Sequence, residues 1–360
     1  MPWQWQPVKE AGMFNPDYRN IVNAAENKKS SRIPLYEHII STLIMEKMTG
    51  KKFPDLAGGD YKDKLEFFRH YCGFFKDSGY DAVSFECGAS GVMPGHGALG
   101  NHREGVIKTR RDFDAYPWDA VPDMYFERYG DYFSALGETM PAGMKAIGGV
   151  GNGVFECVQD IVGFQELCYI KADDEDLYEA LFSGVGDMLV RIWERFLRES
   201  GDIFCVCRFG DDLGYKTNTL LNADDIRKLI IPQYRKVVDL VHAKGKPFLL
   251  HCCGCVFNVM DDIISGARID AKHSNEDVIA PWSRWIDDYG GKIGNFGGLD
   301  TGVLCVNDTT DLVSYTTGVY RLCEKKGRGA AIGSGNSIPN YTDPIRYGQM
   351  LDTIRRLRGD

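Results

Sequence analysis

The stretch QYRKVVDLVHAKGKPFLLHCCGCVFN, residues 233–258, contains the unit that decides the fold. Its first half spaces apolar residues as one face of a helix requires, and Gly245 is a typical helix end. The short apolar run 246–251 follows and predicts a strand that is covered on both faces. The unit is therefore a helix followed by a buried strand, and the strand ends in a histidine and three cysteines.

Apolar runs of this kind recur along the chain. They alternate with stretches of helical spacing, which are clearest at 15–28, 60–77 and 174–200. The predicted strands are residues 81–86, 145–150, 202–208, 246–251, 269–273, 292–297 and 329–334. Strands that alternate with helices indicate a parallel sheet. About seven or eight such units fit a (β/α)8 barrel better than an open sheet.

We therefore expect an α/β fold, a distorted (β/α)8 TIM barrel over residues 81–360. Residues 1–80 are expected to form an N-terminal helical extension. Because no Pro- or Ser-rich linker interrupts the chain, we predict a single domain, 1–360. The sequence GGVGNG, residues 148–153, lacks the spacing of a dinucleotide-binding fingerprint.

Composition narrows the function classes. The 360 residues are 44% hydrophobic and 26% charged, which is typical of a soluble globular protein. The net charge of −9 argues against nucleic acid and anionic membranes as partners. There is no signal peptide and no membrane-spanning run, so we expect a cytoplasmic protein whose eleven cysteines are reduced.

Residues able to bind a metal ion or transfer a proton follow most of the predicted strands. They are Glu86, Asp211, Asp212, His251, His273, Glu276 and Asp300. Active sites of (β/α)8 barrels lie at the C-terminal ends of the strands, which is where these residues fall. We predict that Glu86, Asp211, Asp212 and His273 are catalytic.

His251 and Cys253 are candidate metal ligands. They are two residues apart, so in an extended chain they face the same side and can reach one ion. An imidazole nitrogen and a thiolate together favour zinc. The alternative is that the cysteines are small buried residues, which we prefer for Cys252 and Cys255. Spacing alone leaves both interpretations open.

The segment FLLHCCGCVFNVMDDIISGARIDAKHS, residues 248–274, resembles the H-x-C-G segment of the uroporphyrinogen decarboxylase superfamily. Five further segments resemble superfamily elements in the same order along most of the chain. They are SSRIPLYEH (30–38), GVFECVQDIVGFQEL (153–167), FGDDLGYKTN (209–218), FGGLDTGVL (296–304) and GSGNSIPNYTDPIRY (333–347).

The resemblance implies the corrinoid-dependent methyltransferase branch of this superfamily. The basic N-terminal M-R-Q-A-G-R element of the decarboxylases is missing. Members of the methyltransferase branch bind zinc at H-x-C-G and take a third ligand from a cysteine in the last loop. Here Asn336 stands in place of that cysteine. The departure disfavours activation of a thiol acceptor and favours demethylation of a small O- or N-methyl compound.

The resemblance also implies partners and roles. A corrinoid protein carrying cobalamin would accept the methyl group, and a homodimer is compatible with these expectations. Glu86, His273 and Glu276 are candidates to replace the missing ligand, and we place Glu276 with His251 and Cys253 in the metal site. The candidate substrate-binding residues are Tyr215, Asp300 and Asn336.

Two other functions remain open. One is a decarboxylase-type lyase that needs no metal, and the other is a non-catalytic module that docks a corrinoid protein. Single residues have alternatives as well. Asp211 and Asp212 are equally well explained as a turn cap, Asp300 as a turn or helix cap, and Tyr215 as a packing residue. His38 and His242 are expected to be structural.

Overall fold

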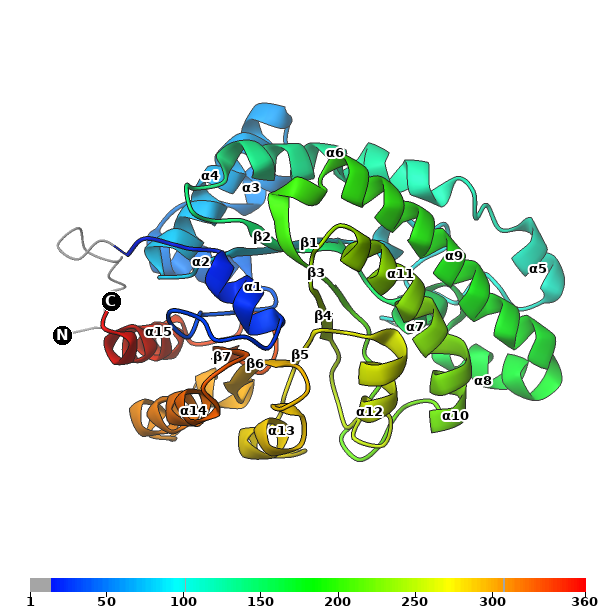
Figure 1. Cartoon of the computed structure of the whole chain (residues 1–360). Coiled ribbons are helices and arrows are strands. Elements are labelled where there is room, and N and C mark those ends of the chain that lie inside the picture. Colours follow the sequence, from blue (N-terminus) through cyan, green and yellow to red (C-terminus); the bar gives the residue numbers. More distant parts are fainter. Residues whose placement is uncertain (1–13, 101, 307) are drawn as a thin grey trace.

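The structure, a computed structural model, describes residues 14–360 apart from 101 and 307. Seven parallel strands form one sheet in their order along the chain (Figure 1). They are β1 (Val83–Gly88), β2 (Ala146–Gly151), β3 (Phe204–Gly210), β4 (Phe248–His251), β5 (Ala271–His273), β6 (Gly294–Leu299) and β7 (Ala330–Ser334). Each predicted strand is present and begins one or two residues later than expected. The sheet curls as in a TIM barrel, which confirms the predicted fold class.

Helices follow the strands and cover the outside of the curled sheet (Figure 1). The N-terminal helices are α1 (Arg19–Ala25), α2 (Thr42–Thr49), α3 (Pro54–Ala57) and α4 (Tyr61–Asp77). The others are α5 (Arg110–Ala115), α6 (Val121–Thr139), α7 (Val154–Val162), α8 (Phe164–Asp173), α9 (Glu175–Glu199), α10 (Ala223–Asp225), α11 (Ile231–Ala243), α12 (Met260–Asp262), α13 (Trp282–Tyr289), α14 (Leu312–Lys326) and α15 (Pro344–Arg358). The division of the chain into an extension and a barrel remains a prediction.

The helical run that leads into residues 233–243 is irregular near Pro232. A π-helical turn, Ile226–Ile230, separates α10 from α11, and Pro232 lies in the first turn of α11. Proline has no N–H to donate and clashes with the preceding turn, so it is tolerated where a helix begins. Pro232 therefore lies at the start of a helix, where it costs no backbone hydrogen bond.

An extended segment, residues 34–41, occupies the place of an eighth strand. Leu35 and Ile40 form isolated parallel bridges with Ile332 and Ile338, beside β7. On the other side, the hydroxyl of Ser84 in β1 donates to the carbonyl of His38 at 2.5 Å. Because this segment makes single bridges instead of a continuous ladder, the barrel is distorted here, and His38 is brought into its interior.

Helix α1 covers the N-terminal end of the barrel. It contacts β3, β6 and β7, and Figure 1 shows it in front of the sheet. Its buried residues Ile21, Ala24 and Ala25 pack against apolar side chains from the barrel interior, among them Leu249 and Phe296. Apolar side chains thus fill this end of the barrel.

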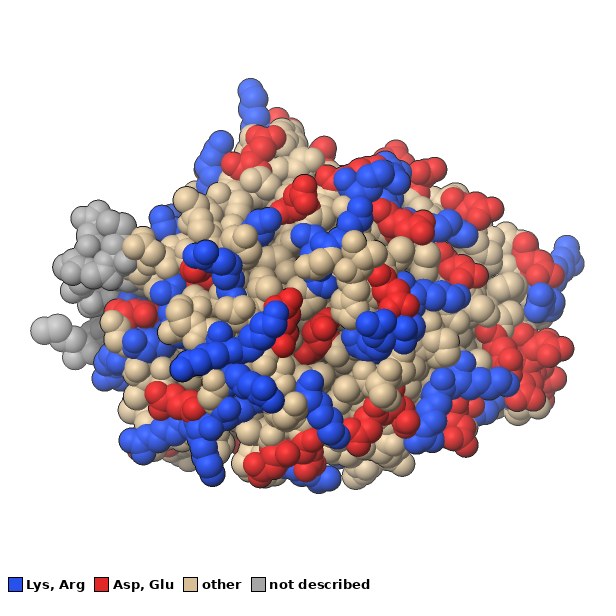
Figure 2. Space-filling model, viewed as in Figure 1, with Lys and Arg blue, Asp and Glu red and all other residues tan. Residues whose placement is uncertain are grey.

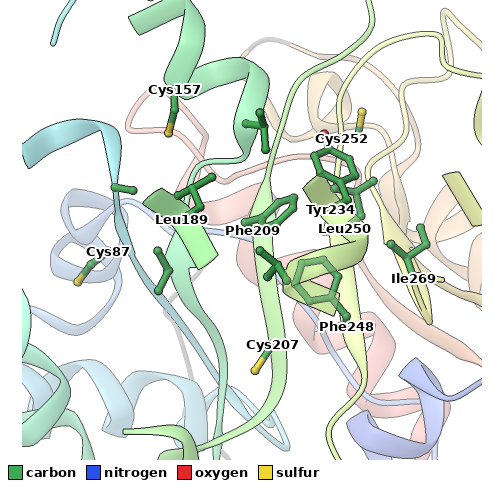
Figure 3. Packing of buried hydrophobic residues seen from close by; sticks show 14 of the residues in the cluster. Cys87, Cys157, Leu189, Cys207, Phe209, Tyr234, Phe248, Leu250, Cys252 and Ile269 are labelled. Atoms are coloured by element: carbon green, nitrogen blue, oxygen red, sulfur yellow. The ribbon is translucent and has the colours of Figure 1, made fainter. Parts of the chain in front are cut away.

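Most cysteines belong to the hydrophobic core. Figure 3 shows Cys87, Cys157, Cys207 and Cys252 among apolar side chains, and all four are buried. All eleven cysteines are free thiols. The packing interpretation therefore holds for Cys252, whereas Cys255 is only half-buried.

The surface in Figure 2 carries basic and acidic side chains interspersed with one another. This mixture agrees with the modest net charge of −9. Among the described residues, none of the helices combines the length and the apolarity that a membrane crossing requires.

Candidate functional site

Three potential metal ligands converge where β3 and β4 end. Nε2 of His251 lies 3.3 Å from Sγ of Cys253 and 3.8 Å from Oδ1 of Asp212. The ligand atoms of all three residues lie within 4.8 Å of one another. Parallel pairing sets Gly210 opposite His251, so that Asp212 and Cys253 lie two residues beyond the same point on adjacent strands. The backbone N–H of Cys253 donates to Asp212 at 2.8 Å and joins the two loops.

A second histidine fixes the orientation of His251. Nδ1 of His251 lies 2.7 Å from Nδ1 of His273, and Nε2 of His273 lies 3.0 Å from the carbonyl oxygen of Ser334. Burial lowers the pKa of His273 to about 3 and the pKa of His251 well below its usual value, so both rings are neutral.

The proton positions follow from these contacts. A carbonyl only accepts, so the proton of His273 is on Nε2 and its Nδ1 is an acceptor. His251 must then donate from Nδ1. This leaves Nε2 of His251 with a free lone pair that faces Cys253 and Asp212, as a metal ligand requires.

The sulfur of Cys253 is surrounded by hydrogen-bond donors. Nδ2 of Asn336 lies 3.3 Å from Sγ, and the hydroxyl of Ser274 lies 3.5 Å from it. Oδ1 of Asn336 accepts from the N–H of Ser337, which turns the amide NH₂ toward the sulfur. Burial raises the pKa of the Cys253 thiol to about 12, and a bound metal ion would deprotonate it. Asn336 thus occupies the position beside Cys253 that the sequence assigned to a missing ligand.

The donor set of His251, Cys253 and Asp212 fits zinc. Imidazole nitrogen, thiolate and carboxylate oxygen are all zinc ligands, and three protein ligands leave a fourth position open, as in catalytic sites. Glu276 does not join this group. Its backbone carbonyl accepts from Ile279 and Ala280 in a turn that leads away from the strand end. Asp212, predicted as a catalytic group, takes the place that we expected for Glu276.

Glu86 is held by a buried arginine. Nε and Nη2 of Arg208 lie 2.9 and 2.7 Å from Oε2 of Glu86. Nη1 of Arg208 donates to the hydroxyls of Tyr36 and Ser84. The side chain of Arg208 is completely buried, so Glu86 is the counter-ion that such a charge requires. Glu86 was predicted at the end of its strand, but β1 continues to Gly88. Arg208 had not been identified from the sequence.

His38 also belongs to the site, although it was expected to be structural. Its ring stacks on His251 with centroids 3.7 Å apart and an angle of 7°. Its Nε2 lies 3.8 Å from Oε1 of Glu86, and its Nδ1 has no hydrogen-bond partner among the described residues. The available signal was the segment 30–38, which ends at this histidine but lies outside the predicted barrel.

Asp211 caps the helix α7, and not the turn that follows it in the sequence, which was the alternative to a catalytic role. Its carboxylate accepts from the N–H groups of Phe155 and Glu156 at 2.9 and 2.8 Å and from the hydroxyl of Tyr234 at 2.6 Å. It thereby satisfies the first turn of α7, which begins after Gly153. A Cβ at Gly153 would lie 2.3 Å from Asp211, so glycine is required there. Burial raises the pKa of Asp211 to about 6.

Glu156, in the first turn of α7, was not among the predicted site residues. Its Oε2 accepts from Nδ2 of Asn152 at 2.8 Å. Burial, followed by the charges of Asp211 and Asp212, raises the pKa of Glu156 well above its usual value. The signal in the sequence was its place directly after the second strand, in the segment 153–167.

Two predicted substrate-binding residues, Asp300 and Tyr215, do not belong to the group of candidate metal ligands. The carboxylate of Asp300 accepts from the N–H groups of Gly302 and Asp277, both at 2.7 Å, in agreement with the capping alternative. Tyr215 is 63% exposed, which excludes the core-packing alternative. Its carbonyl accepts from the N–H of Cys255, so its loop lies beside the metal ligands.

Comparison with known proteins gives one family. The model of the family described as uroporphyrinogen decarboxylase (URO-D) matches residues 104–357. A methyltransferase from Methanosarcina mazei has a similar structure, with a TM-score of 0.68 at 13% identity over 94% of this chain and 98% of that one.

Other solved structures give lower TM-scores. A D-allulose 3-epimerase from Methylomonas sp. gives a TM-score of 0.41 at 10% identity over 92% of this chain and 99% of that one. An AP endonuclease from Brucella melitensis gives 0.41 at 11% identity, with 82% and 93% of the two chains covered. No protein among those with curated descriptions matches the sequence. The likeness to the methyltransferase from Methanosarcina mazei shows a shared fold.

Proposed function

The chain belongs to the uroporphyrinogen decarboxylase family, and from this premise we propose that it is a metal-assisted, corrinoid-dependent methyltransferase. It moves a methyl group from a small O- or N-methylated compound to the corrinoid of a partner protein. The observation that carries the proposal is the convergence of His251, Cys253 and Asp212 at the C-terminal end of the barrel. The similar fold of the methyltransferase from Methanosarcina mazei is consistent with it.

Each residue around the metal ligands has a distinct task. His251 presents the lone pair of Nε2, because His273 and the carbonyl of Ser334 fix its proton on Nδ1. Ser274 and Asn336 point donors at the sulfur of Cys253 and limit its motion. A zinc ion held there would supply Lewis-acid chemistry, polarising the atom from which the methyl group departs.

The donor set favours substrate activation. A site with two thiolates is more electron-rich, which suits the activation of an acceptor thiol. Here one thiolate is replaced by the carboxylate of Asp212, and the amide of Asn336 lies where a second sulfur would be. Fewer sulfur ligands leave the metal a stronger Lewis acid. We therefore assign the protein to the demethylating half of the methyl transfer.

The first experiment measures metal content and methyl transfer together. Wild type and His251→Ala are purified without chelator or metal-affinity resin, and methoxylated and N-methylated compounds are offered with reduced cobalamin. His242→Ala is the matched control, because His242 pairs with Asp270 away from the site. We expect near-stoichiometric zinc and methyl transfer in wild type and the control, and neither in His251→Ala.

The other functions predict different results. Chelator-resistant release of carbon dioxide would support the decarboxylase-type lyase. Tight binding of a corrinoid protein without turnover would support the docking module. The buried Arg208 does not favour the lyase, because its charge is already neutralised by Glu86 and is not available for a substrate carboxylate.

A further inference from the structure

Several carboxyl groups lie at the C-terminal end of the barrel, and Glu86, Asp211 and Asp212 each have a partner of their own. Glu86 is paired with the guanidinium of Arg208. Asp211 accepts three hydrogen bonds, two of them from the first turn of α7, and a carboxyl group that only accepts is ionised. Asp212 accepts from the N–H of Cys253 and lies with the metal ligands.

The carboxyl group of Glu156 has one hydrogen-bond partner among the described residues. Asn152 donates to Oε2, whereas Oε1 accepts no hydrogen bond from the described part of the chain. The side chain is half-buried, and Oε1 is not among the polar atoms that are sealed from solvent without a partner. Asn152 is itself held in a left-handed conformation, with φ of 63°, and its Oδ1 accepts from the N–H of Ser90. The carboxyl group is thus oriented by an amide that is fixed in turn.

The surroundings of Glu156 favour its neutral form. A helix N-terminus normally stabilises a negative charge, but Asp211 already provides that charge for α7. The guanidinium of Arg208 faces Glu86. Burial, and then the charges of Asp211 and Asp212, raise the pKa of Glu156 well above its usual value, which favours the neutral carboxylic acid. Because Oε2 accepts from Asn152, the proton of this acid is on Oε1.

We propose that Glu156 is the catalytic proton donor of the methyl transfer, and that the methyl donor is an ether. This inference rests on the proposed function and narrows its substrate class. In the step, the acceptor supplies the electron pair of a new bond to the methyl carbon while the C–O bond breaks. The electron pair of the broken bond stays on oxygen, which takes the proton from Oε1. The product is an alcohol or a phenol, and Glu156 regains a proton from solvent.

The substrate class follows from this proton. An alkoxide or a phenoxide is a poor leaving group, and its departure is assisted by a carboxylic acid in reach of the oxygen. When a quaternary ammonium compound is demethylated, the leaving group is a neutral amine, which needs no proton. A neutral carboxylic acid at Glu156, beside three other carboxyl groups, therefore favours an ether as the methyl donor.

The test compares wild type with Glu156→Gln on a series of aryl methyl ethers whose phenols differ in pKa. Reduced cobalamin is the acceptor. Glutamine keeps the shape and the contact with Asn152 but has no acidic proton. We expect losses of roughly 10²- to 10⁴-fold in kcat for ethers of weakly acidic phenols. The loss in kcat should become steadily smaller as the phenol becomes more acidic, because the phenoxide then leaves without taking a proton.

Two controls separate this role from others. Glu175→Gln, an exposed residue at the start of α9, should match wild type on every ether. Zinc content should be equal in wild type and Glu156→Gln, because Glu156 is not one of the metal ligands. A loss that is uniform across the series, or no loss, overturns the proton-donor role.

The remaining outcomes concern the substrate. If wild type demethylates tetramethylammonium as fast as the ethers, the ether assignment is wrong. If wild type transfers methyl groups from no donor while retaining zinc, the proposed function fails, and the role of Glu156 fails with it. These results differ from a uniform loss in Glu156→Gln, so the two failures are distinguishable.

Discussion

At the scale of the residue, His273 acts through its neighbour. It does not face the sulfur of Cys253 but accepts from Nδ1 of His251 and so fixes which nitrogen of His251 is free. We expect His273→Ala to weaken zinc binding about 10- to 100-fold, since partners of metal-binding histidines have effects of this size. Competition with a chromophoric chelator measures this. Cys253→Ala, which removes a ligand, should bind zinc more weakly still, and equal affinities would contradict the distinction.

Asn336 offers a second test at this scale, because its Nδ2 lies 3.3 Å from the sulfur of Cys253. Asn336→Cys would add a thiolate to the donor set. We expect tighter zinc binding together with slower demethylation, because an additional sulfur ligand makes the metal a weaker Lewis acid. Asn336→Ser is the control for loss of the amide. A variant with tighter zinc binding and faster demethylation would exclude Lewis-acid activation of the substrate.

At the scale of the element, Asp211 links the end of β3 to the start of α7. It accepts two backbone N–H groups in the first turn of this helix and the hydroxyl of the buried Tyr234. Asp211→Ala should lower the free energy of unfolding by about 2–4 kcal/mol, since it removes a helix cap and leaves buried donors without a partner. Urea denaturation followed by circular dichroism measures the change.

The matched control is Asp311→Ala. Asp311 caps α14 by accepting from the N–H of Ser314, but it is exposed, so water can replace it. Its loss should cost only about 1 kcal/mol. If the two variants lose equal stability, Asp211 contributes no more than an ordinary surface cap.

At the scale of the whole molecule, Glu37 makes stability depend on pH. It is buried between the eighth-strand segment and β7, where it meets Ser334 and Tyr80. Burial raises its pKa to about 8, whereas the unfolded chain ionises near 4.5. Between these values the folded protein holds a proton that the unfolded chain has lost.

This difference in proton binding makes the folded protein less stable as the pH rises. The contribution of Glu37 to stability is complete below about pH 4.5 and is lost as the pH rises to about 8, at about 1.4 kcal/mol per pH unit. Glu37→Gln cannot ionise, so its stability relative to wild type should increase over this window and level off above it. Urea denaturation of both proteins at several pH values tests this, and a constant difference would contradict a raised pKa.

The sequence by itself determined the architecture. Apolar runs such as 246–251 and the helical spacing of 174–200 are local patterns, and burial of an apolar face is enough to make them strands and helices. It also placed His251 and Cys253 together, because residues two apart in an extended chain face the same side, although β4 itself ends at His251. Strand-end positions, and with them the region of the site, follow from the same local signals.

Only the tertiary structure decided which strand ends meet. Asp212, and not Glu276, joins the candidate metal ligands, because the pairing of β3 with β4 sets their loops side by side. Glu276 instead begins a turn after β5. His38 reaches the site only because its segment fills the gap of the missing strand. Glu156 and Asp211 look alike as acids in the sequence. Their roles differ because hydrogen-bond donors surround Asp211 and leave one oxygen of Glu156 free.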